Sequence, residues 1–176
     1  MEYAVLGRTG LRVSRVGFGG GGIGQVWGPT SEVESVRAVH RALDLGVNFF
    51  DVAPGYGNGK AEETLGLALR GRRDAAIVAT KVRLRAEELN DVSAAVRGSV
   101  EASLRRLGMD AVDVLHVHNR FTLRRGDIAD SLSAEDVLGP VLQAYREVQR
   151  AGKTRFIGLS AMDPHVPTLK RILESG

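Results

Sequence analysis

The sequence contains no cysteine, and no stretch of it approaches eighteen consecutive apolar residues. The absence of cysteine excludes disulfide bonds and thiolate metal sites. A membrane-spanning helix requires a longer apolar run than any found here. The N-terminus "MEYAVLGRTG" also lacks the basic start and apolar run of a signal peptide. We therefore expect a cytoplasmic protein with no membrane partner.

Basic residues are abundant but are not gathered into one patch. The formal net charge is only +3, although 20 of the 24 basic residues are arginines. They are scattered, with pairs at Arg72/Arg73, Arg105/Arg106 and Arg124/Arg125. No segment interleaves them with aromatic residues, as a surface for single-stranded nucleic acid requires. We expect no nucleic-acid partner.

The composition and the order of apolar segments predict one soluble α/β domain over residues 1–176. Hydrophobic residues make up 43% of the chain and charged residues 26%, which suits a globular domain with a core. Apolar runs of strand length alternate with segments of helical period. A hairpin is expected over 3–14, with strands over 15–19, 47–51, 75–81, 112–118 and 154–160.

Helix boundaries are predicted from caps and breakers. Ser31 and Glu34 form a capping box, and Gly46 ends the helix that follows. A second helix is expected from about 61 to 70. Asn90 caps the third and Pro140 lies in the first turn of the fourth. Asp163 caps the last, with Pro164 at its first position.

Helical spacing also predicts the buried faces. The expected inward residues are Val33, Val36, Val39 and Leu43 in the first helix, Val92, Val96, Val100, Leu104 and Leu107 in the third, Val141, Leu142, Tyr145 and Val148 in the fourth, and Leu169, Ile172 and Leu173 in the last. The polar segment 119–135 is long for a connection between a strand and a helix, which favours a loop beside a functional face.

Five strand–helix units with apolar strands indicate a parallel sheet, either a (β/α) barrel or a doubly wound sheet. Polar side chains at strand ends distinguish these, because the C-terminal ends converge in a barrel and spread apart in an open sheet. Such residues are Asp51, Lys81, His118 and Ser160, with Tyr56 just after a strand. We predict a (β/α)8 barrel with an N-terminal hairpin, of which about five of the eight units are present.

These polar residues suit hydride addition to a carbonyl group. Asp51 is the expected partner that keeps a buried Lys81 cationic, and this charge lowers the pKa of the Tyr56 phenol from about 10. Tyr56 then becomes a usable proton donor near neutral pH. His118, neutral in that setting, can donate an N–H to the carbonyl oxygen.

At these positions the chain resembles the N-terminal part of an aldo-keto reductase. The motifs are "LGRTGLRVSRVGFGG", "NFFDVAPGYGNGKAEETLG", "IVATK", "VDVLHVHN" and "GKTRFIGLSA", in that order along the whole chain. The resemblance implies a reductase that uses NADP(H), with NAD possible, on an aldehyde, ketone or sugar. It assigns the catalytic roles to Asp51, Tyr56, Lys81 and His118.

The resemblance also implies where the cofactor binds. Ser160 contacts the nicotinamide carboxamide, and the backbone near Gly20 and Gly21 meets the cofactor. Many members have threonine where this chain has Gly20 and Val52, and Asn or Arg at Ala161. A barrel of about 250 residues needs three further strands. We therefore expect either the missing C-terminal half of the barrel or self-association as a partner.

Other interpretations remain open at several residues. A metal site from His116, His118 and Asp51 lacks the usual ligand spacing, and we interpret His116 as barrel filling. "GFGGGGIG" has no acidic residue at the spacing of a Rossmann fingerprint, so we prefer glycine-rich flexibility beside a cofactor, with simple turn formation as the alternative. Trp27 is a candidate wall of the substrate pocket or a cap on the barrel rim. The arginines at 83, 85, 124 and 125 are interpreted as a solvated face, with attraction of a phosphate group as the lesser alternative.

Two rival functions follow from the same residues. One is a non-catalytic aldo-keto reductase-like subunit that binds a cofactor or a partner protein. The other is an enzyme in which Lys81 forms a Schiff base with a carbonyl. The presence of Asp51 and Tyr56 argues against the first, and a carboxylate that keeps Lys81 protonated argues against the second.

Overall fold

A computed structural model describes residues 1–162 and 164–175. The chain divides into two compact units, of which the first comprises Met1–Thr80 and Ala102–Val114. The second comprises Lys81–Glu101 and the residues from Leu115 onward. Strands β5 (Ile77–Val82) and β6 (Val112–Val117) and helix α3 (Val92–Leu107) contribute to both units.

The first unit begins with the predicted hairpin. Strands β1 (Tyr3–Val5) and β2 (Arg12–Ser14) pair antiparallel, and the short helix η1 (Gly7–Thr9) forms the turn. Asn48 fastens the hairpin to the following sheet: its Oδ1 accepts from the Ser14 N–H at 2.7 Å and its N–H donates to Ser14 Oγ at 3.0 Å.

The parallel strands of the first unit are shorter than the sequence predicts. The remaining elements of the unit are β3 (Phe18–Gly19), α1 (Glu32–Asp44), β4 (Phe49–Asp51), α2 (Lys60–Ala68) and η2 (Arg73–Ala75). The predicted first strand loses its beginning because the Arg15 N–H donates to the Glu2 carbonyl at 2.9 Å, which keeps that residue with the hairpin. Phe18 pairs with Phe50 and Phe50 with Val78, in parallel register.

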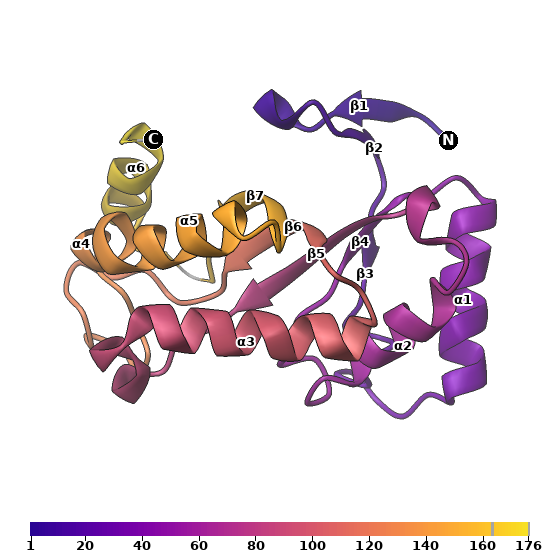
Figure 1. Cartoon of the computed structure of the whole chain (residues 1–176), viewed down its shortest axis with the longest axis horizontal. Coiled ribbons are helices and arrows are strands. Elements are labelled where there is room, and N and C mark those ends of the chain that lie inside the picture. Colours follow the sequence, from indigo (N-terminus) through magenta and orange to yellow (C-terminus); the bar gives the residue numbers. More distant parts are fainter. Residues whose placement is uncertain (163, 176) are drawn as a thin grey trace. The chain divides into compact units, whose positions relative to one another are not determined.

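Helix α1 packs against α2, as seen at the right of Figure 1. The predicted capping box is present: Ser31 Oγ accepts from the Glu34 N–H, and the Glu34 carboxylate accepts from the Ser31 N–H. Ser35, Val39 and Ala42 form the buried face. The prediction for Val33 was wrong, because the first turn of α1 points this side chain to solvent and leaves it 69% exposed.

Helix α3 has the predicted apolar face, and its five inward residues are all buried. Its predicted cap was wrong by one residue. Asp91 Oδ1 accepts from the Ala94 N–H at 3.0 Å, whereas Asn90 belongs to the preceding helix η3 (Ala86–Asn90) and donates to the Glu87 carbonyl. The charged acceptor Asp91 lies directly before the first helical residue and takes the cap.

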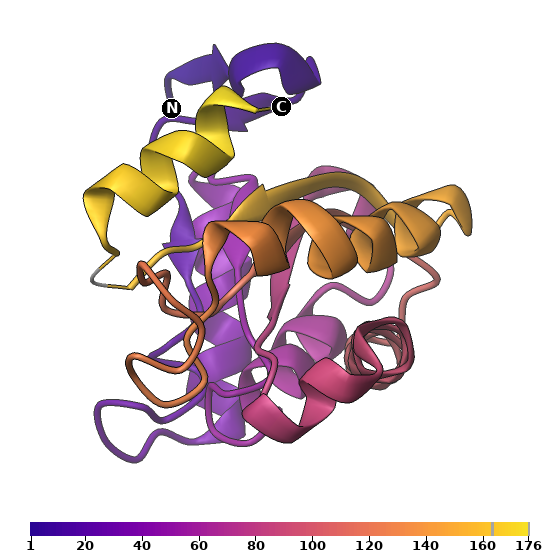
Figure 2. The same cartoon turned by 90° about the vertical axis from the view of Figure 1, so that its left-hand side faces the viewer.

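The second unit places α5 (Leu142–Arg150) along β7 (Thr154–Leu159), in orange shades in Figure 2. Its other helices are α4 (Ala134–Asp136), η4 (Val137–Val141) and α6 (Val166–Glu174), of which α6 packs against α4.

Two helix starts of the second unit differ from the prediction. Ser133 and Asp136 form a capping box before Pro140, and the non-helical backbone of Gly139 breaks the helix just ahead of the proline. The last helix begins at Val166 after His165, so Pro164 lies before it. The predicted cap Asp163 lies outside the described residues. Leu173 is 64% exposed, whereas the adjacent Ile172 is buried, so the inward prediction for Leu173 was wrong.

The five strands from β3 to β7 follow one another in the sheet in sequence order, with β3 and β7 at the edges. A doubly wound sheet reverses its strand order at a switch point, and no reversal occurs among these strands. The β3–β4 and β4–β5 pairs are parallel, which confirms the α/β class with a parallel sheet.

Candidate functional site

In the first unit, Asp51 and Tyr56 belong to one short segment. Asp51 ends β4, and the Val52 N–H continues the strand pairing by donating to the Ala79 carbonyl at 2.9 Å. The Tyr56 N–H then closes a turn onto Ala53, and the Tyr56 carbonyl accepts the Ala61 N–H at 3.2 Å, at the start of α2. We call residues 53–59 the Tyr56 turn. The phenol is half-buried within it.

The other two tyrosines are held by backbone carbonyls. Tyr3 Oη donates to Gly46 O at 2.9 Å, and Tyr145 Oη donates to His116 O at 3.0 Å. Burial raises the pKa of the Tyr145 phenol far above its ordinary value. Both hydroxyl groups are committed to backbone carbonyls, and burial makes the Tyr145 phenol unsuited to releasing a proton near neutral pH.

The glycine-rich segment packs tightly against the Tyr56 turn. The Gly20 N–H donates to Asp51 O at 2.8 Å, and a Cβ at Gly20 would lie 2.5 Å from Val52 Cγ1. A Cβ at Gly24 would lie 2.8 Å from Tyr56 O. The glycines at 20 and 24 therefore permit close packing. This explains the glycine-rich segment better than the flexibility that we preferred from the sequence. Gly20 and Val52 also fit each other, because valine fills the space that a threonine at 20 would need.

Trp27 lines a cavity of about 330 Å³ in the first unit. Its ring covers Gly21, where an added Cβ would lie 2.7 Å from the indole. The ring is nevertheless 80% exposed. The walls include Phe18 of β3 and Ala38 of α1. Trp27 thus lines a cavity between a strand and a helix of the same unit, and Asp51 and Tyr56 are not among its lining residues.

In the second unit, three predicted residues lie at strand ends. Lys81 is the next-to-last residue of β5 and is 2% exposed. His118 follows β6 and donates its backbone N–H to Val82 O at 2.8 Å. Ser160 follows β7 and donates its N–H to Val117 O at 2.9 Å. The strand pairing itself therefore fixes the backbone of His118 and Ser160.

His116 lies one strand alternation before His118 and packs closely against β7. A Cβ at Gly158 would lie 2.9 Å from His116 Cδ2. The glycine makes room for the imidazole ring. This close contact supports the interpretation of His116 as a space-filling residue.

The segment after β6 is more firmly anchored than its polar composition suggests. Asn119 is fully buried, and its amide group donates to Leu84 O at 2.7 Å and to Asp130 O at 2.8 Å. Arg83 pairs with Asp130 at 3.2 Å. An asparagine directly after a buried strand was the signal that could have predicted this anchor.

Asp136 holds the other end of this segment. Burial alone would raise the pKa of its carboxyl, but hydrogen bonds from Arg125 and Ser133 outweigh it and hold the pKa below its ordinary value. Arg83 and Arg125 are therefore ion-pair partners, and the interpretation as a solvated face was incomplete for these two arginines.

Sequence reasoning missed a buried cluster formed by Glu62, Thr80 and Arg106. Glu62 in α2 is 0% exposed. Its Oε1 accepts from Thr80 Oγ1 at 2.6 Å, and its Oε2 accepts from Arg106 Nε at 2.7 Å. Glu62 shares a helical face with Leu65 and Leu69, which are both buried. A carboxylate on an apolar helix face was the signal in the sequence.

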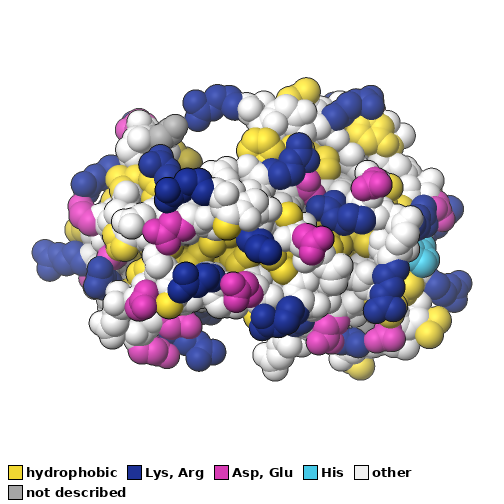
Figure 3. Space-filling model, in the orientation of Figure 1, with side chains coloured by type: hydrophobic (Ala, Val, Ile, Leu, Met, Phe, Trp, Pro, Cys, Tyr) yellow, Lys and Arg dark blue, Asp and Glu magenta, His cyan; other side chains and the backbone are white. Residues whose placement is uncertain are grey.

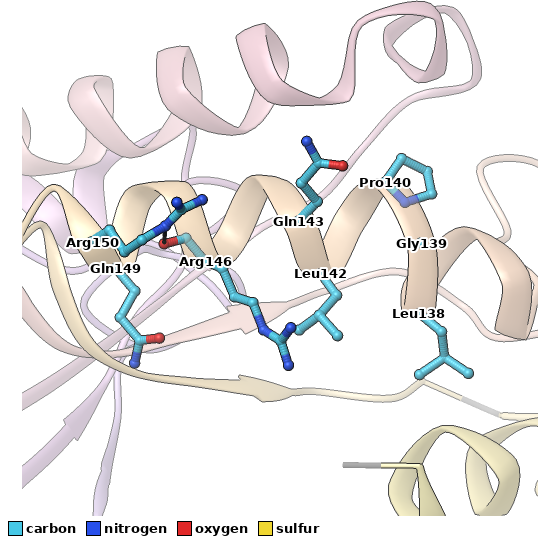
Figure 4. Close-up of a pocket in the computed structure, with 8 residues that line it drawn as sticks. All are labelled: Leu138, Gly139, Pro140, Leu142, Gln143, Arg146, Gln149 and Arg150. Carbon is cyan, nitrogen blue, oxygen red and sulfur yellow. Dashed lines mark hydrogen bonds between the residues drawn. The ribbon is translucent and has the colours of Figure 1, made fainter.

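A groove of about 840 Å³ runs along α5 in the second unit (Figure 4). Leu138, Leu142 and Arg146 lie on one side of the helix in this view, and Gln143 lies on the other. No residue predicted for the site contributes to its walls. On the face drawn in Figure 3, basic and acidic side chains are interspersed.

Within residues 1–162 and 164–175, no helix is both long and apolar enough to cross a membrane. The same residues include no group of three His, Cys, Asp or Glu side chains placed to hold a metal ion.

Comparison with known protein families identifies the family of this chain. The model of the aldo/keto reductase family matches residues 15–174. This chain belongs to that family of oxidoreductases. L-galactose dehydrogenase of Arabidopsis thaliana is 38% identical over 165 residues, which cover 92% of this chain and 49% of the relative. A probable voltage-gated potassium channel subunit beta of Oryza sativa subsp. japonica is 41% identical over 125 residues, covering 67% and 37%.

Solved structures agree with this assignment. The holo form of aldo-keto reductase AKR11C1 from Bacillus halodurans has a TM-score of 0.79 and 30% identity, covering 99% of this chain and 54% of that chain. An aldo-keto reductase from Klebsiella pneumoniae in complex with NADPH has a TM-score of 0.68 and 28% identity, covering 91% and 50%. The chain thus spans about half the length of the relatives that it matches.

Proposed function

We propose that the complete protein reduces an aldehyde, ketone or sugar carbonyl, or oxidises the corresponding alcohol, with a nicotinamide cofactor. The observation that carries this proposal is the family match over residues 15–174. Within that range, the motif resemblance is our reason for assigning the catalytic roles to Asp51, Tyr56, Lys81 and His118. A relative that is an L-galactose dehydrogenase supports sugars as one substrate class. A structural neighbour in complex with NADPH supports NADP(H), with NAD(H) as the alternative.

The residues of this chain supply the proton and the charge stabilisation. When bound, the reduced nicotinamide supplies the hydride that forms the new C–H bond. Tyr56 donates the proton to the carbonyl oxygen, which gains negative charge as the hydride arrives. Lys81 supplies the positive charge that favours loss of this proton, and Asp51 is its carboxylate counter-ion. His118 donates an N–H to the same oxygen and orients it.

Ser160 fits contact with the cofactor better than Gly20 does. A carboxamide both donates and accepts hydrogen bonds, and a serine hydroxyl offers both functions. The Gly20 N–H is already bound to Asp51 O. Any contribution of Gly20 and Gly21 is therefore close approach of the backbone, with no donated hydrogen bond from Gly20. Trp27 is the proposed wall of the substrate pocket.

Replacement of Tyr56 by Phe tests the function. We expect Tyr56→Phe to lower turnover by about 10²- to 10⁴-fold, the range typical of a lost general acid, while cofactor affinity changes little because the ring still packs. Steady-state reduction of an activated aldehyde measures the first quantity and a cofactor titration the second. Tyr3→Phe is the matched control and keeps full turnover. An unchanged turnover in Tyr56→Phe would overturn the role of Tyr56.

A non-catalytic subunit is the second candidate, and the relative that is a probable potassium channel subunit beta favours it. Such a protein binds the cofactor without steady-state turnover. A cofactor titration beside the aldehyde assay separates the two functions: binding without turnover in the wild-type protein supports the second candidate.

We further propose that residues 1–176 form part of a (β/α)8 barrel and need a complementary half or a second copy. Large apolar side chains on α6 remain exposed: Val166 by 69% and Leu173 by 64%. Expressed alone, residues 1–176 are expected to self-associate and to lack reductase activity. Size-exclusion chromatography with light scattering, run beside an NADPH oxidation assay, checks this, and an active monomer of 18.9 kDa would contradict it.

A further inference from the structure

We infer that Glu62 is a positioning residue, which fixes the Tyr56 turn to strand β5 through Thr80 and Arg106. This inference rests on the proposed function, because it explains how the proton donor is held. Glu62 acts through the backbone of the turn and not by contact with substrate or cofactor.

The first step is the connection that Glu62 makes to β5. Its Oε1 accepts from Thr80 Oγ1 at 2.6 Å, and Thr80 directly precedes Lys81 in the strand. Both side chains are almost completely buried, at 0% and 1% exposure. The carboxylate therefore ties the first turn of α2 to the last half of β5.

The second step is the connection from Glu62 to the Tyr56 turn. The neighbouring residue Ala61 donates its N–H to Tyr56 O at 3.2 Å, and Lys60 donates its N–H to Gly57 O at 3.1 Å. Movement of this first helical turn therefore moves the backbone that carries Tyr56.

Arg106 completes the cluster by contacting both Glu62 and the end of the Tyr56 turn. It donates to Glu62 Oε2 at 2.7 Å, and its Cδ lies where a side chain at Gly59 would be, 2.5 Å from an added Cβ. Gly59 has a φ of 94°, which favours glycine, and it ends the Tyr56 turn. The arginine thus covers the end of the turn while neutralising the buried carboxylate.

Stability alone does not account for a carboxylate at this position. A buried ion pair can often be replaced by apolar residues of similar volume without loss of stability. A leucine at position 62 would continue the apolar face of Leu65 and Leu69. An apolar residue cannot accept a directional hydrogen bond from Thr80. The carboxylate therefore fixes the position of the first turn of α2 against β5.

The test compares Glu62→Gln and Thr80→Val with Asp113→Asn. Asp113 is a buried carboxylate of the same unit that also pairs with an arginine, Arg73, at 2.8 Å. It accepts from the Val78 N–H near the start of β5 and so serves as the matched control. Thr80→Val keeps the shape and leaves Glu62 and Arg106 paired, so it tests the bond even where Glu62→Gln does not fold. Thr80→Ser restores the hydroxyl.

Turnover is one readout. For Glu62→Gln and Thr80→Val we expect kcat per folded molecule to fall by about 10- to 100-fold, as displacement of a catalytic group by an ångström does, with the cofactor KM within about threefold. Thr80→Ser recovers most of this loss, and Asp113→Asn keeps kcat within about twofold of wild type. An equal loss of kcat in Asp113→Asn would overturn the inference, because the effect would then be merely structural.

Amide hydrogen exchange is the second readout and needs no activity. We expect the Lys60 and Ala61 amides to exchange at least about tenfold faster in Glu62→Gln and Thr80→Val, and at the wild-type rate in Asp113→Asn. Unchanged exchange at both amides in both variants would overturn the inference. If wild-type protein shows no carbonyl reduction, the proposed function fails, and hydrogen exchange still decides whether Glu62 holds the turn.

Discussion

Glu62 and Asp113 are two buried carboxylates of one unit, each paired with an arginine, yet they secure different parts of the chain. Asp113 Oδ2 accepts from the Val78 N–H at 2.9 Å and from Arg73 Nη2 at 2.8 Å. Arg73 also donates to Ala76 O at 2.6 Å. This cluster fastens the first residues of β5 and the short helix η2 that leads into them.

The Glu62 cluster acts further along the same strand. Its partner Thr80 lies next to Lys81, and its helix begins at the Tyr56 turn. In the (β/α)8 barrel proposed above, the C-terminal ends of the strands would carry the chemistry and the N-terminal ends stability. Two chemically similar ion pairs therefore have different roles, because they join different segments of the chain.

The largest expected effect concerns the residue after Thr80. Lys81→Met removes the cation that tunes Tyr56, so turnover should fall by at least about 10²-fold. Asp51→Asn should act in the same direction but more mildly, since it loosens the lysine without removing its charge. Steady-state kinetics over a range of pH check both. A wild-type rate and pH profile for Asp51→Asn would contradict the electrostatic role of Asp51.

The next effect separates the two ion pairs by stability. Arg106→Met leaves the fully buried Glu62 without its guanidinium group, and we expect the free energy of unfolding to fall by about 3 kcal/mol. Arg73→Met should cost only about 1 to 2 kcal/mol, because the Asp113 side chain is 6% exposed, against 0% for Glu62, and it keeps the backbone Val78 N–H as a donor. Urea unfolding of the complete protein measures both. Equal losses would show that the two carboxylates are equally dependent on their arginines.

The smallest effect lies in the second unit and depends on pH. The pKa of Asp136 is held below its ordinary value, so its contribution to stability is present above the unfolded value, about 3.9, and is lost as the pH falls through the folded pKa. Because Arg125 is largely exposed, we expect this contribution to be at most about 1 kcal/mol.

Asp136→Asn tests this contribution, because the variant has no carboxyl group at position 136 whose protonation could lower the stability at acidic pH. Urea unfolding at pH 7 and below pH 4 should show a flatter pH dependence for the variant than for wild type. A variant with an unchanged slope of stability against pH would show that other carboxylates account for the acid loss.

The sequence predicts elements that depend on local rules. The Ser31–Glu34 capping box, the hairpin and the inward face of α3 are present, because each is set by residues close together in the chain. Strand-end placement of Asp51, Lys81 and His118 also follows from local alternation of apolar residues.

Features that depend on distant partners were not predictable in this way. Two helix starts were also missed for a local reason: Asp91 rather than Asn90 caps α3, and a helix capped by Ser133 begins at Ala134, before Pro140, where several capping signals compete. The role of Glu62 depends on Arg106, 44 residues further along the chain. The tight packing of Gly24 on Tyr56 likewise depends on the fold and not on a motif.

The most direct test of the central claim follows the hydride itself. The complete protein is incubated with an aldehyde and NADPH carrying deuterium at the transferable C4 position, and the alcohol is analysed by mass spectrometry. We predict one deuterium on the former carbonyl carbon, formed at least about 10²-fold more slowly by Tyr56→Phe than by wild type. An alcohol without deuterium, or no alcohol at all from the wild-type protein, would contradict a carbonyl reductase.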